Sequence, residues 1–280
     1  MSVSAVSPCG VTLADLAVLD RFAFEAVGAQ GTLPVRLYVP RGQPSGLIVF
    51  FPPGGFVEDT LDLLEPFAQA LAVRNNCCVL AARYTLAGEA PFPAAAEDAY
   101  ALLQWTAGAR DALHWQNGPL LVAGIEAGGN LAAVVGLMCR DRGGVALAGQ
   151  ILITPMLDAE LSSCSMRALA IEGNGIGIAN ACAAGYRQYL PNAADRIHPY
   201  ASPLQSSRLK GLARCLILSA QDDALRDEAE RYATHLREQD VPTTLVRLPP
   251  LGIADPSARC DGVRVEGTLA AIHTFFQAID

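Results

Sequence analysis

The feature that most constrains this chain is a cluster of glycines around a single glutamate, in the segment Gly124-Ile125-Glu126-Ala127-Gly128-Gly129-Asn130. A short apolar run, residues 119–123, comes directly before it, and residues 130–139 have the composition of a helix. Glycines between a buried strand and a helix predict a sharp turn, because small residues let the two elements approach closely. The sequence therefore places the Glu126 carboxylate at a tight strand-to-helix turn.

Short apolar runs alternate with longer helical stretches along the chain. Such alternation is typical of a mainly parallel sheet with helices on both faces. The predicted strands are residues 33–39, 47–51, 78–84, 120–125, 150–153, 215–219 and 244–248. The predicted helices are residues 61–74, 94–107, 130–140, 180–189, 226–238 and 266–278. The fold class that follows is α/β, with a mainly parallel twisted sheet flanked by helices.

Length and composition favour one domain. The chain has 280 residues, of which 51% are hydrophobic and 17% charged, so it can bury one large core. No low-complexity linker divides it, and we expect a single domain over residues 1–280. Residues 161–195 interrupt the alternation after a strand, and an insertion there would lie over the carboxyl ends of the strands, where open α/β sheets bind ligands. We therefore interpret residues 161–195 as a cap or lid.

Charge and cysteine content argue against several classes of function. The net charge of −8 disfavours nucleic acid, whose phosphates bind clustered lysine and arginine. The eight cysteines show no C-x-x-C spacing, so neither a zinc site nor a disulfide framework is indicated. No apolar stretch reaches the roughly 18 residues of a membrane span, and the N-terminus lacks the features of a signal peptide. We expect a cytoplasmic protein without metal or cofactor.

Several ordered motifs resemble those of one known family. They are the glycine motif in residues 50–56, the segment 84–98, the turn around Glu126, and residues 155–158, 199–204 and 223–228. Together they are similar to the α/β-hydrolases of the bacterial hormone-sensitive-lipase-like esterase family, in which such a turn is the G-x-S-x-G nucleophile elbow. The resemblance runs from about Phe22 to the C-terminus. It implies the α/β-hydrolase fold with a reduced cap, of which residues 1–21 are a short N-terminal remnant.

The departures from that family fall on its catalytic positions. Glu126 stands where the family has its nucleophilic serine, and the H-G-G-G motif is reduced to Pro52-Pro53-Gly54-Gly55. The segment that carries the family's histidine reads Pro249-Pro250-Leu251-Gly252-Ile253-Ala254-Asp255, so Ile253 marks the approximate position of a missing base. Asp223 alone matches the triad, and with no imidazole to orient we interpret it as a triad-acid remnant that caps the next helix.

The backbone part of the site is expected to survive. The family builds its oxyanion hole from backbone N–H groups, which by position belong to Gly54, Gly55 and Ala127. The carboxylate of Glu126 would face these donors and, when ionised, can only accept hydrogen bonds.

Three interpretations of Glu126 follow. In the first, its carboxylate is a plug that satisfies the N–H groups of the oxyanion hole and of the following helix. In the second, it is a general base that removes a proton next to a carbonyl group. In the third, it is a nucleophile that forms an acyl or alkyl intermediate, a scheme that in other α/β-hydrolases goes with a histidine that is missing here.

A serine triad acts as a unit, so a chain without its nucleophile and base is expected not to hydrolyse esters. The sequence thus predicts a non-hydrolytic protein that binds a small apolar ligand or a protein partner. The alternative is a lyase, isomerase or cyclase with Glu126 as base, and a residual carboxylesterase is the least favoured. No nucleic acid is expected, and a homodimer is left open.

Overall fold

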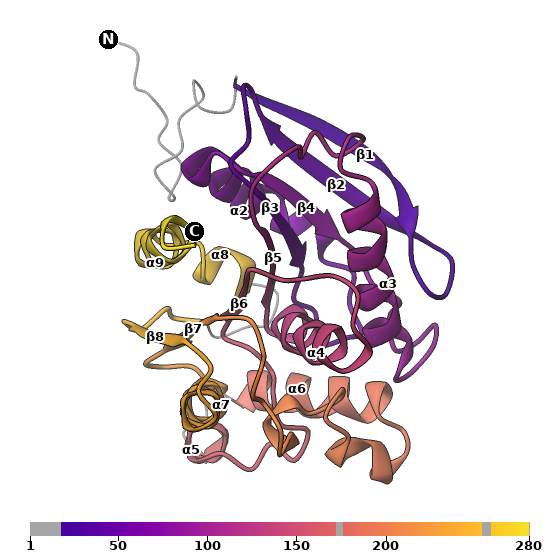
Figure 1. The fold of residues 1–280 in the computed structure, drawn as a ribbon. Coiled ribbons are helices and arrows are strands. Elements are labelled where there is room, and N and C mark those ends of the chain that lie inside the picture. Colours follow the sequence, from indigo (N-terminus) through magenta and orange to yellow (C-terminus); the bar gives the residue numbers. More distant parts are fainter. Residues whose placement is uncertain (1–17, 172–175, 254–258, 280) are drawn as a thin grey trace.

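A computed structural model describes residues 18–171, 176–253 and 259–279. Within these residues eight strands form one sheet in the order β1-β2-β4-β3-β5-β6-β7-β8 (Figure 1). The pairs β1 with β2 and β2 with β4 are antiparallel, and the remaining neighbours are parallel. The fold class predicted from the sequence is confirmed.

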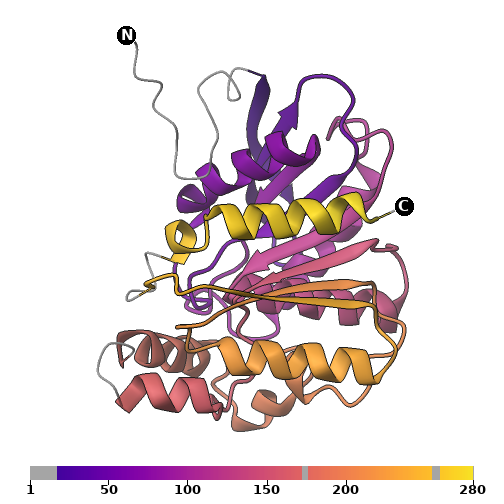
Figure 2. The ribbon, with the colours of Figure 1, turned by 90° about the vertical axis from the view of Figure 1, so that its left-hand side faces the viewer.

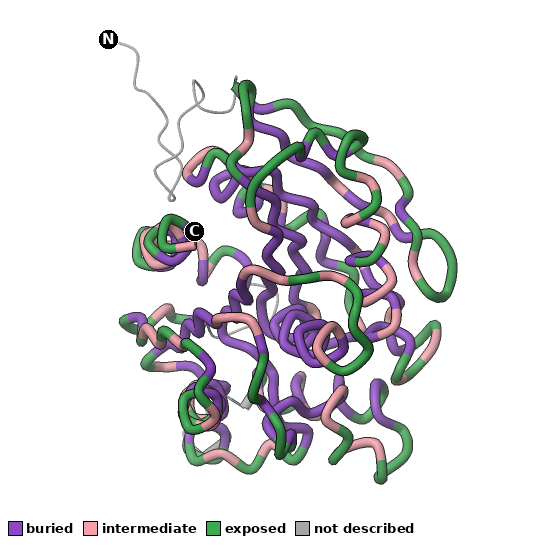
Figure 3. The backbone as a smooth tube through the Cα atoms, in the orientation of Figure 1, coloured by how far each residue is buried: buried purple, intermediate pink, exposed green. Residues whose placement is uncertain are grey.

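The central strands form the middle of the hydrophobic core. Every residue of β3 to β7 is buried, as expected for parallel strands that are covered on both faces. Figure 3 shows this buried backbone running through the centre of the molecule. The strands are β1 (Leu19–Val27), β2 (Thr32–Pro40), β3 (Leu47–Phe51), β4 (Cys78–Ala82), β5 (Leu120–Ile125), β6 (Gly149–Ile153), β7 (Cys215–Ala220) and β8 (Thr243–Leu248).

Helices cover both faces of the sheet. α2 and α9 lie side by side on one face (Figure 2), and α3 and α4 pack together on the other. α7 packs on β7 and β8. The helices are α2 (Leu61–Asn75), α3 (Ala94–Gly108), α4 (Ala127–Arg142), α5 (Cys164–Ile171), α6 (Ile176–Tyr189), α7 (Arg226–Glu238), α8 (Arg259–Gly262) and α9 (Glu266–Gln277), with the 3₁₀ turns η1 (Ala193–Ile197) and η2 (Pro203–Gln205).

The predicted elements all form, but the sequence did not reveal β1, α5 or the short helix α8. β1 is an edge strand in which most side chains are exposed or half-buried, so it lacks the continuous apolar run that marked the central strands. The segment 161–195, predicted as a cap, contains α5, α6 and the start of η1. Most of the predicted N-terminal cap remnant, residues 1–17, lies outside the described residues. Among the described helices, none combines the length and hydrophobicity needed to cross a membrane.

Candidate functional site

The turn between β5 and α4 is a true elbow with Glu126 at its tip. Glu126 has φ 55° and ψ −111°, a left-handed conformation that costs a non-glycine residue of order 1 kcal/mol or more. The elements on either side leave no room for larger residues. A Cβ on Gly124 would lie 2.0 Å from the Gly128 carbonyl oxygen, and one on Gly128 would lie 2.1 Å from that of Phe51. Glycine is therefore required at both positions for this turn to close.

The backbone of Glu126 is clamped on both sides. Its N–H donates to the Ile153 carbonyl at 3.0 Å, and its carbonyl accepts the N–H groups of Asn130 and Met156, both at 3.0 Å. The Asn130 side chain in turn donates to the carbonyls of Met156 and Ala201, each at 2.9 Å. The elbow is thus fixed to the neighbouring loops, and the side chain of Glu126 is the part of this residue that can move.

The Glu126 carboxylate lies on the expected backbone donors. The N–H groups of Gly54 and Gly55 both donate to Oε2, at 2.8 and 2.9 Å. Ala127, the third expected donor, makes no hydrogen bond to this carboxylate, although both residues lie in the described part of the chain. Two N–H groups that converge on one oxygen have the geometry of an oxyanion hole, which we define here as the N–H pair of Gly54 and Gly55.

An arginine that the sequence analysis did not identify completes the site. The guanidinium of Arg259 makes two hydrogen bonds to the Asp223 carboxylate, at 2.9 and 3.1 Å, and a third to the Thr154 hydroxyl at 3.0 Å. Its Nε lies 3.8 Å from Oε1 of Glu126. The site therefore contains a row of three charges, Glu126, Arg259 and Asp223, in which the arginine lies between two carboxylates.

All three charged side chains are buried. The exposed fraction is 3% for Glu126, 2% for Asp223 and 0% for Arg259. Burial would lower the pKa of Arg259, but the negative charges of Asp223 and Glu126 outweigh it and raise that pKa. Arg259 is thus a permanent buried cation, held by two acidic neighbours, as buried charges require.

The remaining predicted positions can now be placed. Ile253 is buried and packs beside Gly262. A Cβ added to Gly262 would lie 2.7 Å from the Ile253 side chain. The side chain that reaches Asp223 is Arg259, six positions after Ile253. The cap predicted for Asp223 does not form, because α7 has no side-chain cap bond. Asp223 accepts the N–H of Leu225, the residue before the helix, at 3.3 Å, and its main partner is the arginine.

The four histidines take no part in these contacts. His198 accepts the N–H of Tyr200 through Nδ1, and its ring packs against Phe92 and Tyr200. His114 stacks on Phe22, and His273 contacts Asn75. Within the described residues, no histidine hydrogen-bonds Glu126 or Asp223. The site therefore offers no imidazole in the role of a base.

Two thiols lie near the charges of the site, that of Cys260, next to Arg259, and that of Cys182, on α6. Burial, together with the nearby charge of Glu126, raises the pKa of Cys182 well above its usual value. A thiol reacts as its thiolate, so burial makes Cys182 a poor nucleophile. Among the described residues, no group of three histidine, cysteine or acidic side chains is arranged to hold a metal ion.

Helix α6 covers the oxyanion hole. A Cβ on Gly185 would lie 2.3 Å from the Gly55 carbonyl oxygen, so the helix and the loop are in direct backbone contact. The next residue of the loop, Phe56, stacks on Tyr189 with ring centroids 3.9 Å apart and an angle of 7° between the planes. These contacts explain why Glu126 is closed off from solvent.

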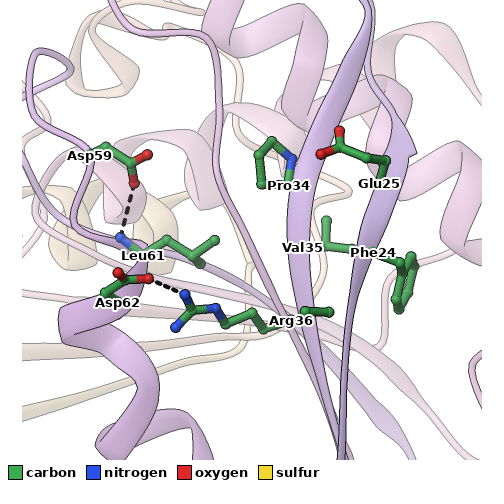
Figure 4. A pocket seen from close by; sticks show the side chains of 9 residues that line it. Phe24, Glu25, Pro34, Val35, Arg36, Asp59, Leu61 and Asp62 are labelled. Atoms are coloured by element: carbon green, nitrogen blue, oxygen red, sulfur yellow. Dashed lines mark hydrogen bonds and ion pairs between the residues drawn. The ribbon is translucent and has the colours of Figure 1, made fainter.

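A hollow of about 530 Å³ elsewhere on the surface does not belong to this site. It lies between β1, β2 and the start of α2 (Figure 4), and Glu126, Asp223 and Arg259 are not among its lining residues. Its one cationic lining side chain, Arg36, is paired with Asp62 and Glu65. It therefore presents no free positive charge to a ligand.

Glu228, in the first turn of α7, is a further buried acid near the site. Its Oε1 accepts the N–H of Leu157 at 2.8 Å, and burial raises the pKa of Glu228 well above its usual value. In the folded state the Glu228 carboxyl group then keeps its proton at pH values at which the same group in the unfolded chain, with its ordinary pKa of about 4.5, has lost it. The stability of the wild type therefore falls, relative to a variant without this acid, as the pH rises beyond that value.

We expect Glu228→Gln to raise the free energy of unfolding at pH 8, and to have little effect near pH 4. Denaturant unfolding at the two pH values measures this. Glu230→Gln on the same helix is the matched control, because a hydrogen bond from Arg247 lowers the pKa of Glu230 and the effect should be of opposite sign at pH 8. A Glu228→Gln variant that is less stable than wild type at pH 8 would contradict the prediction.

Comparison with known proteins identifies the family. A family described as having the alpha/beta hydrolase fold matches residues 48–253. An arylesterase of Saccharolobus solfataricus is 30% identical over 217 residues, which are 77% of this chain and 70% of the arylesterase. The carboxylic ester hydrolase LipN of Mycobacterium tuberculosis is 37% identical over 218 residues, 75% of this chain and 57% of LipN. An esterase structure from Pyrobaculum calidifontis has a TM-score of 0.82 at 33% identity, covering 93% of this chain and 87% of that one.

These comparisons contradict the function expected from the sequence. The relatives are named esterases, whereas we expected a non-hydrolytic protein that binds a small apolar ligand or a protein partner. That expectation is wrong, and the alternative of a lyase, isomerase or cyclase falls with it. Both expectations assumed that a chain without the family's serine and histidine side chains has also lost the family's chemistry. With sheet order, elbow and matched residues in agreement, the chain belongs to the hormone-sensitive-lipase-like esterase family of the α/β-hydrolase fold.

Proposed function

We propose that the protein hydrolyses carboxylic esters, with the Glu126 carboxylate as attacking group in place of the family's serine. The observation that carries the proposal is the pair of hydrogen bonds from Gly54 and Gly55 to one carboxylate oxygen, at 2.8 and 2.9 Å. Backbone N–H groups aimed at one point stabilise the oxyanion that develops during acyl transfer. The names of the relatives, arylesterase, carboxylic ester hydrolase and ethyl acetate hydrolase, support the same substrate class.

The reaction has two steps. The ester carbonyl oxygen binds the N–H groups of Gly54 and Gly55, and a carboxylate oxygen of Glu126 attacks the carbonyl carbon. The tetrahedral intermediate collapses, the bond to the leaving oxygen breaks, and a mixed anhydride of Glu126 remains. Water then attacks the anhydride, which releases the acid and restores the carboxylate, while the proton from water passes to the solvent or to the departed alcohol. An anhydride is much more reactive toward water than an ester, so this step does not need a histidine.

The same scheme favours esters of phenols. Among the described residues no histidine is placed to protonate the leaving oxygen, so in this scheme that oxygen departs as an anion. Phenolates are much better leaving groups than alkoxides. We therefore propose aryl esters as the preferred substrates, in line with the arylesterase among the relatives.

The test is hydrolysis by the purified protein. We expect turnover of phenyl acetate and p-nitrophenyl butyrate above the buffer rate, and slower turnover of ethyl acetate. Hydroxylamine added during turnover should trap the anhydride as a hydroxamate, found by mass spectrometry on the peptide that contains Glu126. Wild-type protein that matches buffer with all three esters would refute the proposal.

The variants Glu126→Gln and Glu126→Ser should both fall to the buffer rate. The amide is not a nucleophile, and the serine would have no base to remove its proton. The surface variant Glu97→Gln, which breaks an exposed pair with Arg142, is the control that should keep wild-type turnover. Retained turnover in Glu126→Gln would show that another group attacks the ester.

Three further features are part of the proposal. Residues 161–195 would act as a cap on a single domain, supported by the contact of Gly185 with the oxyanion-hole loop. A cytoplasmic location is supported by the seven cysteines within the described residues, all of which are free thiols. Cell fractionation tests the location. A homodimer also remains a proposal, which sedimentation would test.

A further inference from the structure

We propose that Arg259 is a positioning residue, which gives the Glu126 carboxylate a second binding place and so frees the oxyanion hole for an ester carbonyl. The inference rests on the proposed function, because it concerns how the same site admits its substrate. It assigns a role to the buried row of charges that the family resemblance did not predict.

The need for a second place follows from competition for the same donors. The N–H groups of Gly54 and Gly55 are both taken by Oε2 of Glu126. An ester carbonyl can bind there only when the carboxylate moves away. A buried carboxylate that lost these donors without finding another would be strongly destabilised. The carboxylate therefore needs another donor within a short distance.

Arg259 supplies that donor. Its Nε lies 3.8 Å from Oε1 of Glu126, and this N–H makes no hydrogen bond to any described residue although the side chain is fully buried. A charge-assisted hydrogen bond has a length of about 2.7–2.9 Å, so a shift of about 1 Å would complete it. The carboxylate would then exchange two backbone donors for one charged donor and remain paired in both positions.

The arginine itself is held still. Its two terminal nitrogens are bound to Asp223 at 2.9 and 3.1 Å, and one of them also donates to Thr154 at 3.0 Å. These bonds fix the plane of the guanidinium and hence the position of Nε. The glutamate side chain, which has several rotatable bonds, is the partner that moves.

The experiment measures binding of phenylacetone, the ketone that replaces the ester oxygen of phenyl acetate by a methylene group and cannot be hydrolysed. Protein with ¹⁵N-labelled glycine reports the Gly54 and Gly55 amides directly as the ketone is titrated. Four proteins form a cycle: wild type, Asp223→Asn/Arg259→Gln, Glu126→Ala, and the triple variant. Replacing Asp223 together with Arg259 avoids leaving the Asp223 carboxylate unpaired, and Glu126 keeps its hydrogen bonds from Gly54 and Gly55, so that the variant can fold.

We expect the ketone to shift both amide resonances in the wild type, and to bind about tenfold or more weakly to Asp223→Asn/Arg259→Gln, the loss expected for a hydrogen bond to a charged group. In the Glu126→Ala background the same pair of substitutions should not change the affinity, because no carboxylate has to be displaced. Equal losses in both backgrounds, no loss in either, or no binding to any of the four proteins would overturn the proposal. Glu97→Gln/Arg142→Gln, which neutralises an exposed pair, is the matched control and should bind like wild type.

Hydrolysis of phenyl acetate, measured on the wild type and on Asp223→Asn/Arg259→Gln, separates this inference from the proposed function. If the loss of ketone affinity depends on Glu126 as expected but no ester is hydrolysed, the ester-hydrolase proposal alone would be overturned. Turnover with no coupling between Glu126 and Arg259 would overturn the positioning role alone. If Arg259 positions Glu126 as proposed, Asp223→Asn/Arg259→Gln should show a KM for phenyl acetate that is raised in proportion to its weaker binding of the ketone.

Discussion

Arg259→Met should lower the free energy of unfolding by about 3–5 kcal/mol, because removing one partner of a buried ion pair leaves the other charge without compensation. The carboxylate of Asp223 is 2% exposed and would lose two hydrogen bonds of 2.9 and 3.1 Å. Glu126 would lose its only cationic neighbour within 4 Å among the described residues. Methionine keeps much of the arginine's length, so the loss reports the charge more than the packing.

Denaturant unfolding at neutral pH measures this loss, and Asp223→Asn/Arg259→Met is its control. The double variant removes both charges, so it should recover much of the stability lost in the single variant. A single variant within about 1 kcal/mol of wild type would mean that Asp223 reaches water or another cation when Arg259 is absent.

Gly185→Ala should both destabilise the fold and impair the site. The added methyl group would lie 2.3 Å from the Gly55 carbonyl oxygen, a clash with backbone that rotation of a side chain cannot relieve. Overpacking of this kind costs about 1–3 kcal/mol. The displaced loop carries both N–H groups that bind Glu126, and a misplacement of about 1 Å in such a site can reduce turnover roughly 10²-fold.

The melting temperature and the turnover of phenyl acetate are the two measurements for this variant. Gly108→Ala is the matched control, because Gly108 is the last residue of α3 and a Cβ there would meet no atom within 4 Å. That substitution should leave turnover unchanged and stabilise the protein by up to about 1 kcal/mol. Wild-type stability and turnover in Gly185→Ala would show that α6 can move off the loop without consequence.

The sheet and its helices could be predicted because their signal is local. Strands such as β5 are continuous apolar runs, and the glycines around Glu126 predict the turn after β5. β1 carries no such signal, since its pairing with β2 decides its conformation more than its own residues do. Family motifs brought Gly54, Gly55, Glu126 and Asp223 to one candidate site, because each lies at or near the carboxyl end of a parallel strand.

Arg259 could not be found in the same way. Its partners lie 36 and 133 positions earlier in the chain, and its own neighbours in sequence form no motif. A charge argument could have indicated it, since a buried Asp223 without a histidine needs another cation. The expectation for function was wrong for a related reason: it counted the side chains that are absent, whereas the chemistry also depends on which groups occupy their place.

The clamped backbone of Glu126 determines how this site can respond to a substrate. Its N–H and carbonyl are both bound within the sheet and its loops, and α4 is buried from Ala127 to Met138. No loop closure is then available at the elbow itself, and any rearrangement there is a rotation of the Glu126 side chain. If the proposed function holds, an ester can reach the oxyanion hole only after α6, which contacts the loop at Gly55, has moved away from it. In this scheme the position of α6 controls access of the ester to the site, and the side chain of Glu126 carries out the chemistry.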